Sequence, residues 1–212
     1  MTSGHHDPLT VFVVDDDPGV RDSLALMLGL AGYRTTLFAD AEAFLHAYRD
    51  EWAGCVVADL RLPGRSGVEL QAELRARGSA LPFVIITAHG DVPTARAAFQ
   101  AQAVDFLEKP FNDVQLLAAI ETAFAIEQRR TQRTHARRSD ADRLAKLTSR
   151  ERQVLDYAAK GLHAKEIATV LGISSRTVEV HKTRIMAKLG VRNVAELVRF
   201  ALAAEAPPER YR

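Results

Sequence analysis

A buried strand that ends in a carboxylate is predicted at Val56-Val57-Ala58-Asp59-Leu60-Arg61-Leu62-Pro63-Gly64. The apolar run up to residue 58 is typical of a strand buried on both faces, and Pro63-Gly64 marks a turn. In an open α/β sheet, ligands bind in the crevice beyond the carboxyl ends of the strands. Asp59 is therefore predicted to face a ligand or a reacting group, although an aspartate in this place can also simply cap the next turn.

Further apolar segments alternate with helical patterns around this strand. Strands are predicted at residues 9–14, 33–38, 54–58, 82–87 and 103–107. Helices are predicted at residues 18–31, from Asp40 through Tyr48, at 66–77, at 91–101, and from Asn112 onward. Five strand–helix units predict a flavodoxin-like α/β domain, with a five-stranded parallel sheet covered on both faces.

Polar side chains follow four of the five predicted strands. Asp15 and Asp16 follow the first, Asp59 ends the third, Thr87 ends the fourth and Lys109 follows the fifth. Because these strand ends converge at one edge of such a sheet, the five side chains are expected to share a pocket. Clustered carboxylates repel one another unless a cation neutralises them, and Mg²⁺ (or Mn²⁺) prefers oxygen ligands.

This pocket predicts that Asp59 is a nucleophile that accepts a phosphoryl group. Asp16, Asp59 and the backbone carbonyl of Arg61 are the predicted metal ligands, with Asp15 acting through water. Lys109 is expected to offset charge on the transferring phosphoryl oxygens, and Thr87 to bond one of them after transfer. Taken singly, each residue could instead be an ordinary solvated or capping side chain.

The charge of the chain is divided unevenly along its 212 residues. Residues 1–126 hold 9 Lys and Arg against 17 Asp and Glu, a balance of −8, whereas residues 127–212 hold 19 against 10, a balance of +9. The division predicts two domains with different partners, and a basic second part suits nucleic acid. The apolar runs are too short to span a membrane, no secretory signal is evident, and the single cysteine, Cys55, excludes an intramolecular disulfide.

A helix-turn-helix pattern lies in the basic part. Thr148 and Glu151 form a capping box, a short helix is predicted at 164–171, Gly172 makes the turn, and Ser174 caps a longer helix at 175–189. Asn193 is expected to cap a last helix. The longer helix is predicted to present an outer face that suits a phosphate-lined major groove, made of Ser175, Arg176, Glu179, Val180, Lys182, Thr183 and Lys188.

The polar, arginine-rich residues 127–146 contain no Gly or Pro. They predict a helical, weakly packed linker, whose arginines either face solvent or touch DNA phosphates. The expected organisation is a disordered tail (1–8), an α/β domain (9–126), this linker (127–146), a four-helix DNA-binding domain (147–205) and a second tail (206–212).

Two family resemblances follow from these motifs. Residues 10–126 resemble the receiver domain of two-component response regulators, through Val14-Asp15-Asp16, the stretch that begins at Asp59, Thr87-Ala88 and Lys109-Pro110-Phe111. Segments 86–93 and 104–111 are similar to the FixJ-type subgroup. Residues 147–203 resemble the LuxR/NarL-type output domain, through Leu147-Thr148-Ser149-Arg150-Glu151, Lys165-Glu166-Ile167-Ala168, Leu171-Gly172-Ile173-Ser174 and Thr177-Val178.

The first resemblance implies a bacterial, cytoplasmic regulator in which a sensor histidine kinase phosphorylates Asp59. It implies that Thr87 and Phe106 form a switch pair. Position 106 is Phe rather than Tyr, so the switch cannot depend on a contact of a tyrosine hydroxyl. It also implies a cis peptide bond before Pro110. It also implies a homodimer that forms on phosphorylation, and the predicted dimer face comprises Val92, Arg96, Phe99 and Val114.

The second resemblance implies sequence-specific binding to double-stranded promoter DNA. It also allows RNA polymerase as a further partner. Base reading would fall to Glu179, Val180 and Thr183. Phosphate contacts would fall to Lys165, Arg176, Thr177, Lys182 and Arg184.

Two alternative functions assign different roles to Asp59. A phosphorylation-independent DNA-binding regulator would keep the receiver only as a dimer scaffold. A phosphatase-like enzyme would need a second, acid/base Asp two residues after the first, where this chain has Arg61. Slow self-dephosphorylation is the only catalysis expected.

Overall fold

The first part of the chain folds around a five-stranded sheet in the computed structural model, which describes residues 9–88, 96 and 98–205. The strands are β1 (Thr10–Val14), β2 (Arg34–Phe38), β3 (Gly54–Asp59), β4 (Phe83–Thr87) and β5 (Asp105–Glu108). Their order is β2-β1-β3-β4-β5, and every neighbouring pair is parallel. This confirms the predicted doubly wound α/β fold.

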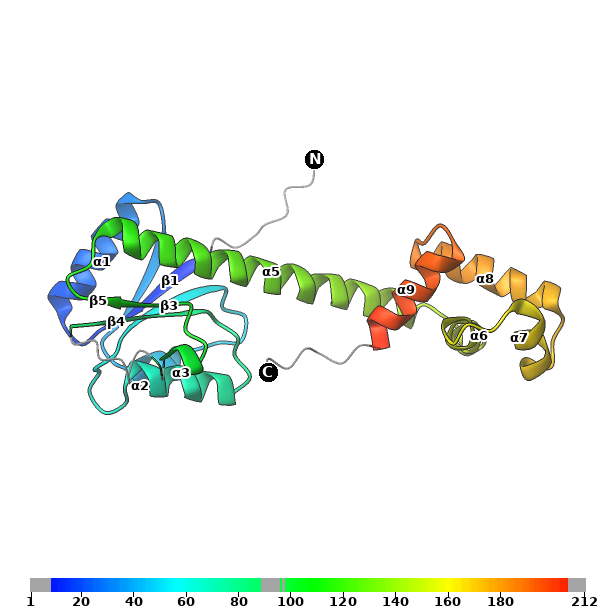
Figure 1. Cartoon of the computed structure of the whole chain (residues 1–212), viewed down its shortest axis with the longest axis horizontal. Helices are drawn as coiled ribbons and strands as arrows, with labels where there is room; N and C mark the ends of the chain where they lie inside the picture. Colours follow the sequence, from blue (N-terminus) through cyan, green and yellow to red (C-terminus); the bar gives the residue numbers. More distant parts are fainter. Residues whose placement is uncertain (1–8, 89–95, 97, 206–212) are drawn as a thin grey trace. The chain divides into compact units, whose positions relative to one another are not determined.

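Helices cover both faces of the sheet (Figure 1). Helices α1 (Pro18–Leu30) and α5 (Asp113–Ala145) cover one face, and α2 (Ala41–Ala47) and α3 (Gly67–Ala76) cover the other. Asp17, Asp40 and Ser66 cap α1, α2 and α3 with their side chains, so the caps expected at Asp17 and Asp40 are present. Alternate residues of β1 and β3 enter the two core clusters, because successive side chains of a strand point to opposite faces.

Several predicted boundaries shift by one or two residues. The fifth strand begins at Asp105 rather than at residue 103, because Ala103 N bonds Ala98 O in the preceding turn. Of the predicted helix 91–101, residues 96 and 98–100 are helical, and residues 91–95 and 97 lie outside the described residues, as do both tails.

A glycine permits the close approach of β3 to β1. Gly54 has φ +152°, and a Cβ placed there would lie 1.8 Å from the carbonyl oxygen of Thr10. The first residue of β3 therefore needs glycine for both its backbone conformation and the space beside it.

The chain divides into two compact units, residues 1–130 and 131–212, and the division falls inside α5. Leu116, Ile120 and Ala123 of this helix enter the core that faces α1, and Leu144 packs against the core of the second unit. The residues predicted as a helical linker are helical through Ala145, and residues 132–139 are exposed.

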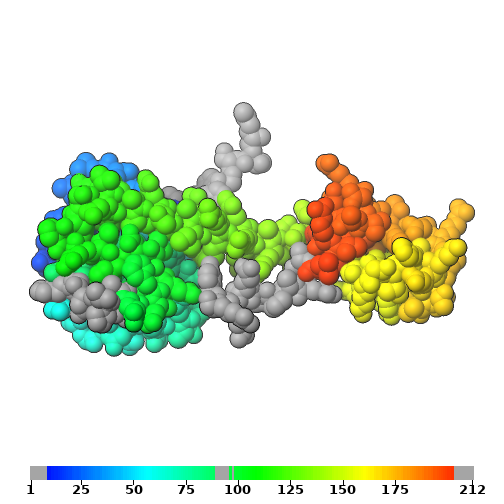
Figure 2. All heavy atoms as spheres, viewed as in Figure 1, coloured from blue at the N-terminus to red at the C-terminus, as the bar shows by residue number. Residues whose placement is uncertain are grey.

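The second unit is a four-helix domain. Its helices are α6 (Ser149–Ala159), α7 (Ala164–Leu171), α8 (Ser175–Leu189) and α9 (Val194–Glu205). They share one apolar core that includes Val154, Ile167, Val178, Ile185 and Leu197. In Figure 2 the yellow atoms of α6 and α7 and the orange and red atoms of α8 and α9 lie close against one another. No helix in the described part of the chain is both long and apolar enough to cross a bilayer.

Candidate functional site

Parallel pairing of the strands brings the predicted pocket residues to one edge of the sheet. Val14 lies opposite Ala58 and Asp59 lies opposite Ile86, so Asp15, Asp59 and Thr87 end three adjacent strands. Asp15 is 1% exposed, Asp59 is 7% exposed and Thr87 is 1% exposed. The structure confirms the expected convergence, and it places two carboxylates where water is largely excluded.

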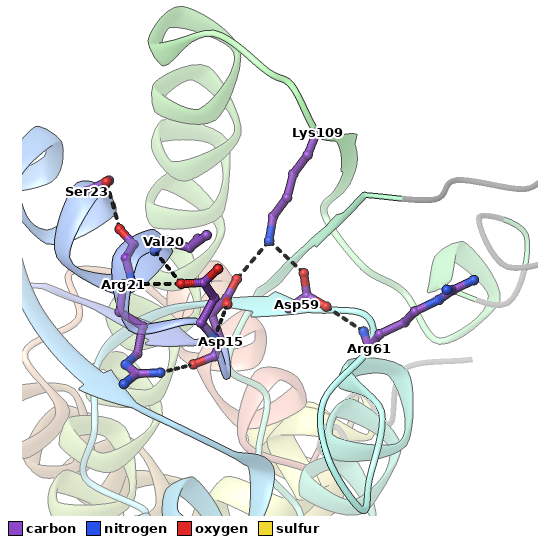
Figure 3. A network of polar contacts seen from close by, with 9 residues as sticks. Asp15, Val20, Arg21, Ser23, Asp59, Arg61 and Lys109 are labelled. Atoms are coloured by element: carbon purple, nitrogen blue, oxygen red, sulfur yellow. Dashed lines mark hydrogen bonds and ion pairs between the residues drawn. The ribbon is translucent and has the colours of Figure 1, made fainter.

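Lys109 joins the two buried carboxylates (Figure 3). Its Nζ lies 2.8 Å from Asp15 Oδ2 and 2.8 Å from Asp59 Oδ1. Burial alone would lower the pKa of Lys109, but the hydrogen bonds to Asp15 and Asp59 outweigh burial and raise the pKa above its usual value. The ammonium group therefore stays charged and places a positive charge within hydrogen-bond distance of both carboxylates.

Backbone groups hold the second oxygens of both carboxylates. The backbone N–H of Arg61 donates to Asp59 Oδ2 at 2.6 Å, and that of Asp17 donates to Asp15 Oδ1 at 2.9 Å. Arg21 Nη1 donates to the carbonyl oxygen of Asp15 at 2.6 Å. Arg21 was not identified from the sequence, because a positive residue in the first turns of a helix gives no signal that it will bond the preceding loop.

Gly67 is a second residue that the sequence pattern does not single out. A Cβ at Gly67 would lie 2.5 Å from the carbonyl oxygen of Asp59, so α3 can begin this close to β3 only with glycine in this place. The N–H of Gly67 donates to Leu60 O at 3.0 Å, which closes the loop that follows Asp59. The turn residues Pro63-Gly64 indicated a loop but not its close packing.

The donor set at this edge suits a hard cation. Asp16 is exposed beside the buried Asp15, so three carboxylates lie on the ends of β1 and β3. In the described residues, no three His, Cys, Asp or Glu side chains are grouped closely enough to form a complete metal cage. Mg²⁺ commonly binds through one or two carboxylates and keeps several waters, and Asp16, Asp59 and the Arg61 carbonyl supply oxygen atoms of the kind that it prefers.

The predicted switch residues lie on the two neighbouring strands β4 and β5. Thr87 is buried at the end of β4, and its carbonyl oxygen accepts from the Lys109 N–H at 2.6 Å. Phe106 on β5 is partly buried against the core beneath α2 and α3. The Lys109–Pro110 bond is cis, as the resemblance implied.

The expected dimer face is described in part. Phe99 is 52% exposed and Val114 is 75% exposed, and Arg96 is exposed as well. Val92 lies outside the described residues. The three described members are therefore accessible to a partner.

Local signals in the second unit build the expected helix-turn-helix. Thr148 and Glu151 form the predicted capping box, and Gly172 ends α7 with φ 65°. Ser174 accepts from the N–H of Thr177 and caps α8, and Asn193 Oδ1 accepts from the N–H of Glu196 at the start of α9. Each of these caps was predicted from sequence, because capping depends on residues within one helical turn.

The outer face of α8 differs from the prediction at one position. Of the predicted outer face, Arg176, Glu179, Val180, Thr183 and Lys188 are exposed and Ser175 is half-buried. Of the predicted phosphate contacts, Thr177 and Arg184 on α8 and Lys165 on α7 are exposed as well. Lys182 is only 8% exposed, so the prediction that it lies on the outer face is wrong. It falls on the stripe of Val178, Ile185 and Leu189, and the long aliphatic part of a lysine can occupy such a stripe.

A polar cluster that the sequence did not reveal joins α8 to the first turn of α6 and to the residues before α6. Lys188 Nζ donates to Glu151 Oε2 at 2.7 Å and to the carbonyl oxygen of Lys146 at 3.2 Å. Arg143 Nη1 donates to the carbonyl oxygen of Leu189 at 3.4 Å. These bonds join residues about 40 positions apart, and local patterns carry no signal for them.

Comparison with known proteins assigns both parts of the chain. The response regulator receiver domain model matches residues 11–121, and the model for bacterial regulatory proteins of the luxR family matches residues 145–201. The transcriptional regulatory protein FixJ of Bradyrhizobium diazoefficiens is 44% identical over 203 residues, which cover 96% of this chain and 97% of that protein. FixJ of Rhizobium meliloti is 45% identical over 201 residues, which cover 92% and 95%.

Solved structures agree with the sequence comparison. The response regulator StyR has a TM-score of 0.82 and 44% identity, with 92% of this chain and 98% of that chain covered. Full-length FixJ from B. japonicum has a TM-score of 0.57 and 44% identity, with 92% and 96% covered. The chain therefore belongs to the FixJ-like response regulators, transcription regulators that join a receiver domain to a LuxR-type DNA-binding domain.

Proposed function

We propose that a sensor histidine kinase phosphorylates Asp59, and that this modification controls dimerisation and sequence-specific binding to promoter DNA. One observation carries the proposal: the buried carboxylate of Asp59 lies at the carboxyl end of β3, 2.8 Å from a lysine ammonium that it shares with Asp15. This arrangement places a positive charge beside the carboxylate oxygen that would attack the phosphorus.

The proposed phosphoryl transfer is a displacement at phosphorus, in which one bond forms as another breaks. A carboxylate oxygen of Asp59 forms a bond to phosphorus, and the bond from phosphorus to the donor breaks. With a phosphohistidine donor the ring nitrogen keeps the electron pair, and with acetyl phosphate the departing acetate keeps it. Lys109 stabilises the charge on the phosphoryl oxygens, and the hydroxyl of Thr87 donates to one of them after transfer.

The metal requirement follows from the surrounding charge. Asp16, Asp59 and the backbone carbonyl of Arg61 would hold Mg²⁺ or Mn²⁺, and Asp15 would act through a bound water. When bound, the ion would offset negative charge on the phosphoryl group and the carboxylates.

The response to phosphorylation would pass through Thr87 and Phe106. The added charge of roughly −1.5 to −2 draws Thr87 toward the phosphoryl group. The space beside Thr87 then favours a new position of Phe106, which alters the face that carries Arg96, Phe99 and Val114. A dimer formed there would present two copies of α8 to half-sites roughly 34 Å apart, one turn of DNA.

Intact mass spectrometry tests the phosphorylation step. Acetyl phosphate with Mg²⁺ should add one phosphoryl group to the wild type and none to Asp59→Ala, and removal of Mg²⁺ by a chelator should slow the addition. Asp22→Asn, a change at an exposed carboxylate of α1, serves as the control and should label normally. Equal labelling of Asp59→Ala would show that another residue is the acceptor. The decay of the added mass after donor removal measures self-dephosphorylation, which should be slow.

DNA affinity separates this function from its rival. The proposed function predicts tighter binding to a selected DNA site, and a larger sedimenting species, after treatment with acetyl phosphate. A regulator that uses the receiver only as a scaffold would bind equally before and after treatment, and Asp59→Ala would bind like the wild type.

A further inference from the structure

Lys182 combines a buried side chain with a charged group on the helix predicted to read DNA. Its side chain is 10% exposed, and its Nζ donates to Glu179 Oε1 at 3.2 Å. The Glu179 side chain is 60% exposed. The lysine therefore reaches its partner from the buried side of α8, and on a DNA groove facing this helix the glutamate would lie between the lysine and the DNA.

The burial of Lys182 explains why it needs this partner. A buried ammonium loses its water and is tolerated where an acceptor replaces that water. Its aliphatic part lies on the same stripe as Val178 and Ile185, which belong to the core, so the side chain cannot swing freely toward a phosphate. Arg176 and Arg184 are exposed and are better placed for phosphate contacts.

The pair also changes what Glu179 can do near DNA. An isolated carboxylate is repelled by the phosphate charge of the groove, whereas a carboxylate that is paired with an ammonium presents a nearly neutral unit. Lys182 engages Oε1, so Oε2 can accept a hydrogen bond from the amino group of a cytosine. The contact at Oε1 also restricts the rotation of the glutamate, which aims Oε2.

We propose that Lys182 is a positioning residue that sets base specificity through Glu179, rather than a phosphate contact. The proposal builds on the proposed DNA-binding function and on base reading by Glu179. It assigns the cation of Lys182 no direct share in the attraction between the protein and the DNA backbone.

Affinity for a selected DNA site, and for every single-base variant of that site, tests the proposal. The full chain is treated with acetyl phosphate and Mg²⁺ and measured at several salt concentrations. Lys182→Met keeps the buried aliphatic volume and removes the charge. It should relax discrimination at one base pair by about tenfold, the same base pair that Glu179→Gln relaxes. The double variant should be no less selective than Glu179→Gln alone, because both changes remove one interaction.

Two further variants keep the test decisive. Arg184→Ala should weaken binding to all sequences alike and lower the salt slope by about one unit, whereas Lys182→Met should leave the slope unchanged. Lys182→Arg, which keeps a cation next to Glu179, should retain most of the base preference. Thermal melting identifies any variant that loses its fold.

The outcomes separate the positioning role from the function on which it depends. If Lys182→Met lowers the salt slope and weakens all sequences, Lys182 is a phosphate contact and the proposal fails. If it leaves the base preference intact while Glu179→Gln changes it, Glu179 reads DNA without help and the proposal fails again. If Glu179→Gln alters no preference, base reading by Glu179 itself is wrong, and the role of Lys182 is lost with it.

Discussion

Single residues at the carboxyl end of the sheet carry the charges on which the proposed phosphorylation depends. Two buried carboxylates share the ammonium of Lys109, so the three groups together keep one negative charge. Both carboxylates also accept a backbone N–H, and Asp59 is the more exposed of the two, 7% against 1%. The small difference in exposure favours Asp59 over Asp15 as the proposed acceptor.

Lys109→Met should slow phosphorylation without removing the acceptor. The variant loses the cation that offsets charge on the transferring group, so labelling by acetyl phosphate should slow by about 100-fold or more. Intact mass over time measures the rate. Lys160→Met, which removes an exposed lysine cation near Tyr157, should label at the wild-type rate. An unchanged rate in Lys109→Met would remove Lys109 from the mechanism.

Gly54→Ala should destabilise the first unit strongly. The new methyl group would meet the Thr10 carbonyl oxygen, and the φ of +152° is unfavourable for alanine. Each effect costs about 1–3 kcal/mol in the free energy of unfolding. Urea unfolding followed by tryptophan fluorescence measures the loss. Gly29→Ala on α1, where an added Cβ meets nothing within 4 Å, should instead stabilise by about 0.5–1 kcal/mol.

At the scale of elements, the last turn of α5 belongs structurally to the DNA-binding unit. Leu144 packs against its core, Arg143 bonds the carbonyl end of α8, and Lys188 of α8 bonds the carbonyl oxygen of Lys146. These bonds satisfy carbonyl groups that helices leave unpaired at their C-terminal ends. The residues that end α5 therefore help to hold α8 within its own unit.

The ion pair between Lys188 and Glu151 should make the stability of the second unit depend on acid. The hydrogen bond from Lys188 and the bond from the Thr148 N–H hold the pKa of Glu151 at about 2, below its ordinary 4.5. A depressed pKa means that the folded unit favours the ionised acid, so this stabilisation is complete above pH 4.5 and is lost as the pH falls toward 2.

Urea unfolding followed by helical circular dichroism measures this dependence. The wild type should exceed Glu151→Gln in the free energy of unfolding above pH 4.5, and the difference should shrink as the pH approaches 2. A constant difference across that range would mean that the charge of Glu151 contributes nothing. Glu166→Gln, at the exposed start of α7, controls for the general effect of removing an acid from a first turn.

At the scale of the whole molecule, the two units have separate cores and should unfold separately. Trp52, the single tryptophan of the chain, packs against the core of the first unit beside Phe12. Its fluorescence should therefore follow the first unit, whereas helical circular dichroism should follow both. Gly54→Ala should shift the fluorescence transition to lower urea and leave a second dichroism transition in place. Coincident shifts of all signals would show that the units unfold as one.

The sequence predicted the fold class, the five strands and the helix-turn-helix because these depend on short-range patterns. Apolar runs, helix caps and turn glycines act within a few residues, as at Asp17, Thr148 and Gly172. The convergence of Asp15, Asp59, Thr87 and Lys109 also followed from sequence, since parallel strands bring their carboxyl ends to one edge. The sequence did not predict the exact ends of the strands. The backbone N–H of Ala103 donates to Ala98 O, so β5 begins to pair with β4 only at Asp105.

The sequence alone determined which residues end the strands and which cap the helices, and with them the proposed acceptor pocket and the helix proposed to read DNA. Tertiary structure alone decided that Lys109 is shared between two carboxylates, that Gly67 lets α3 approach Asp59, and that Lys182 is buried beside Glu179. The physical reason is one of range. Caps and periodicity depend on neighbours in the chain, whereas burial, ion pairing and close approach depend on side chains that only the packed fold brings together.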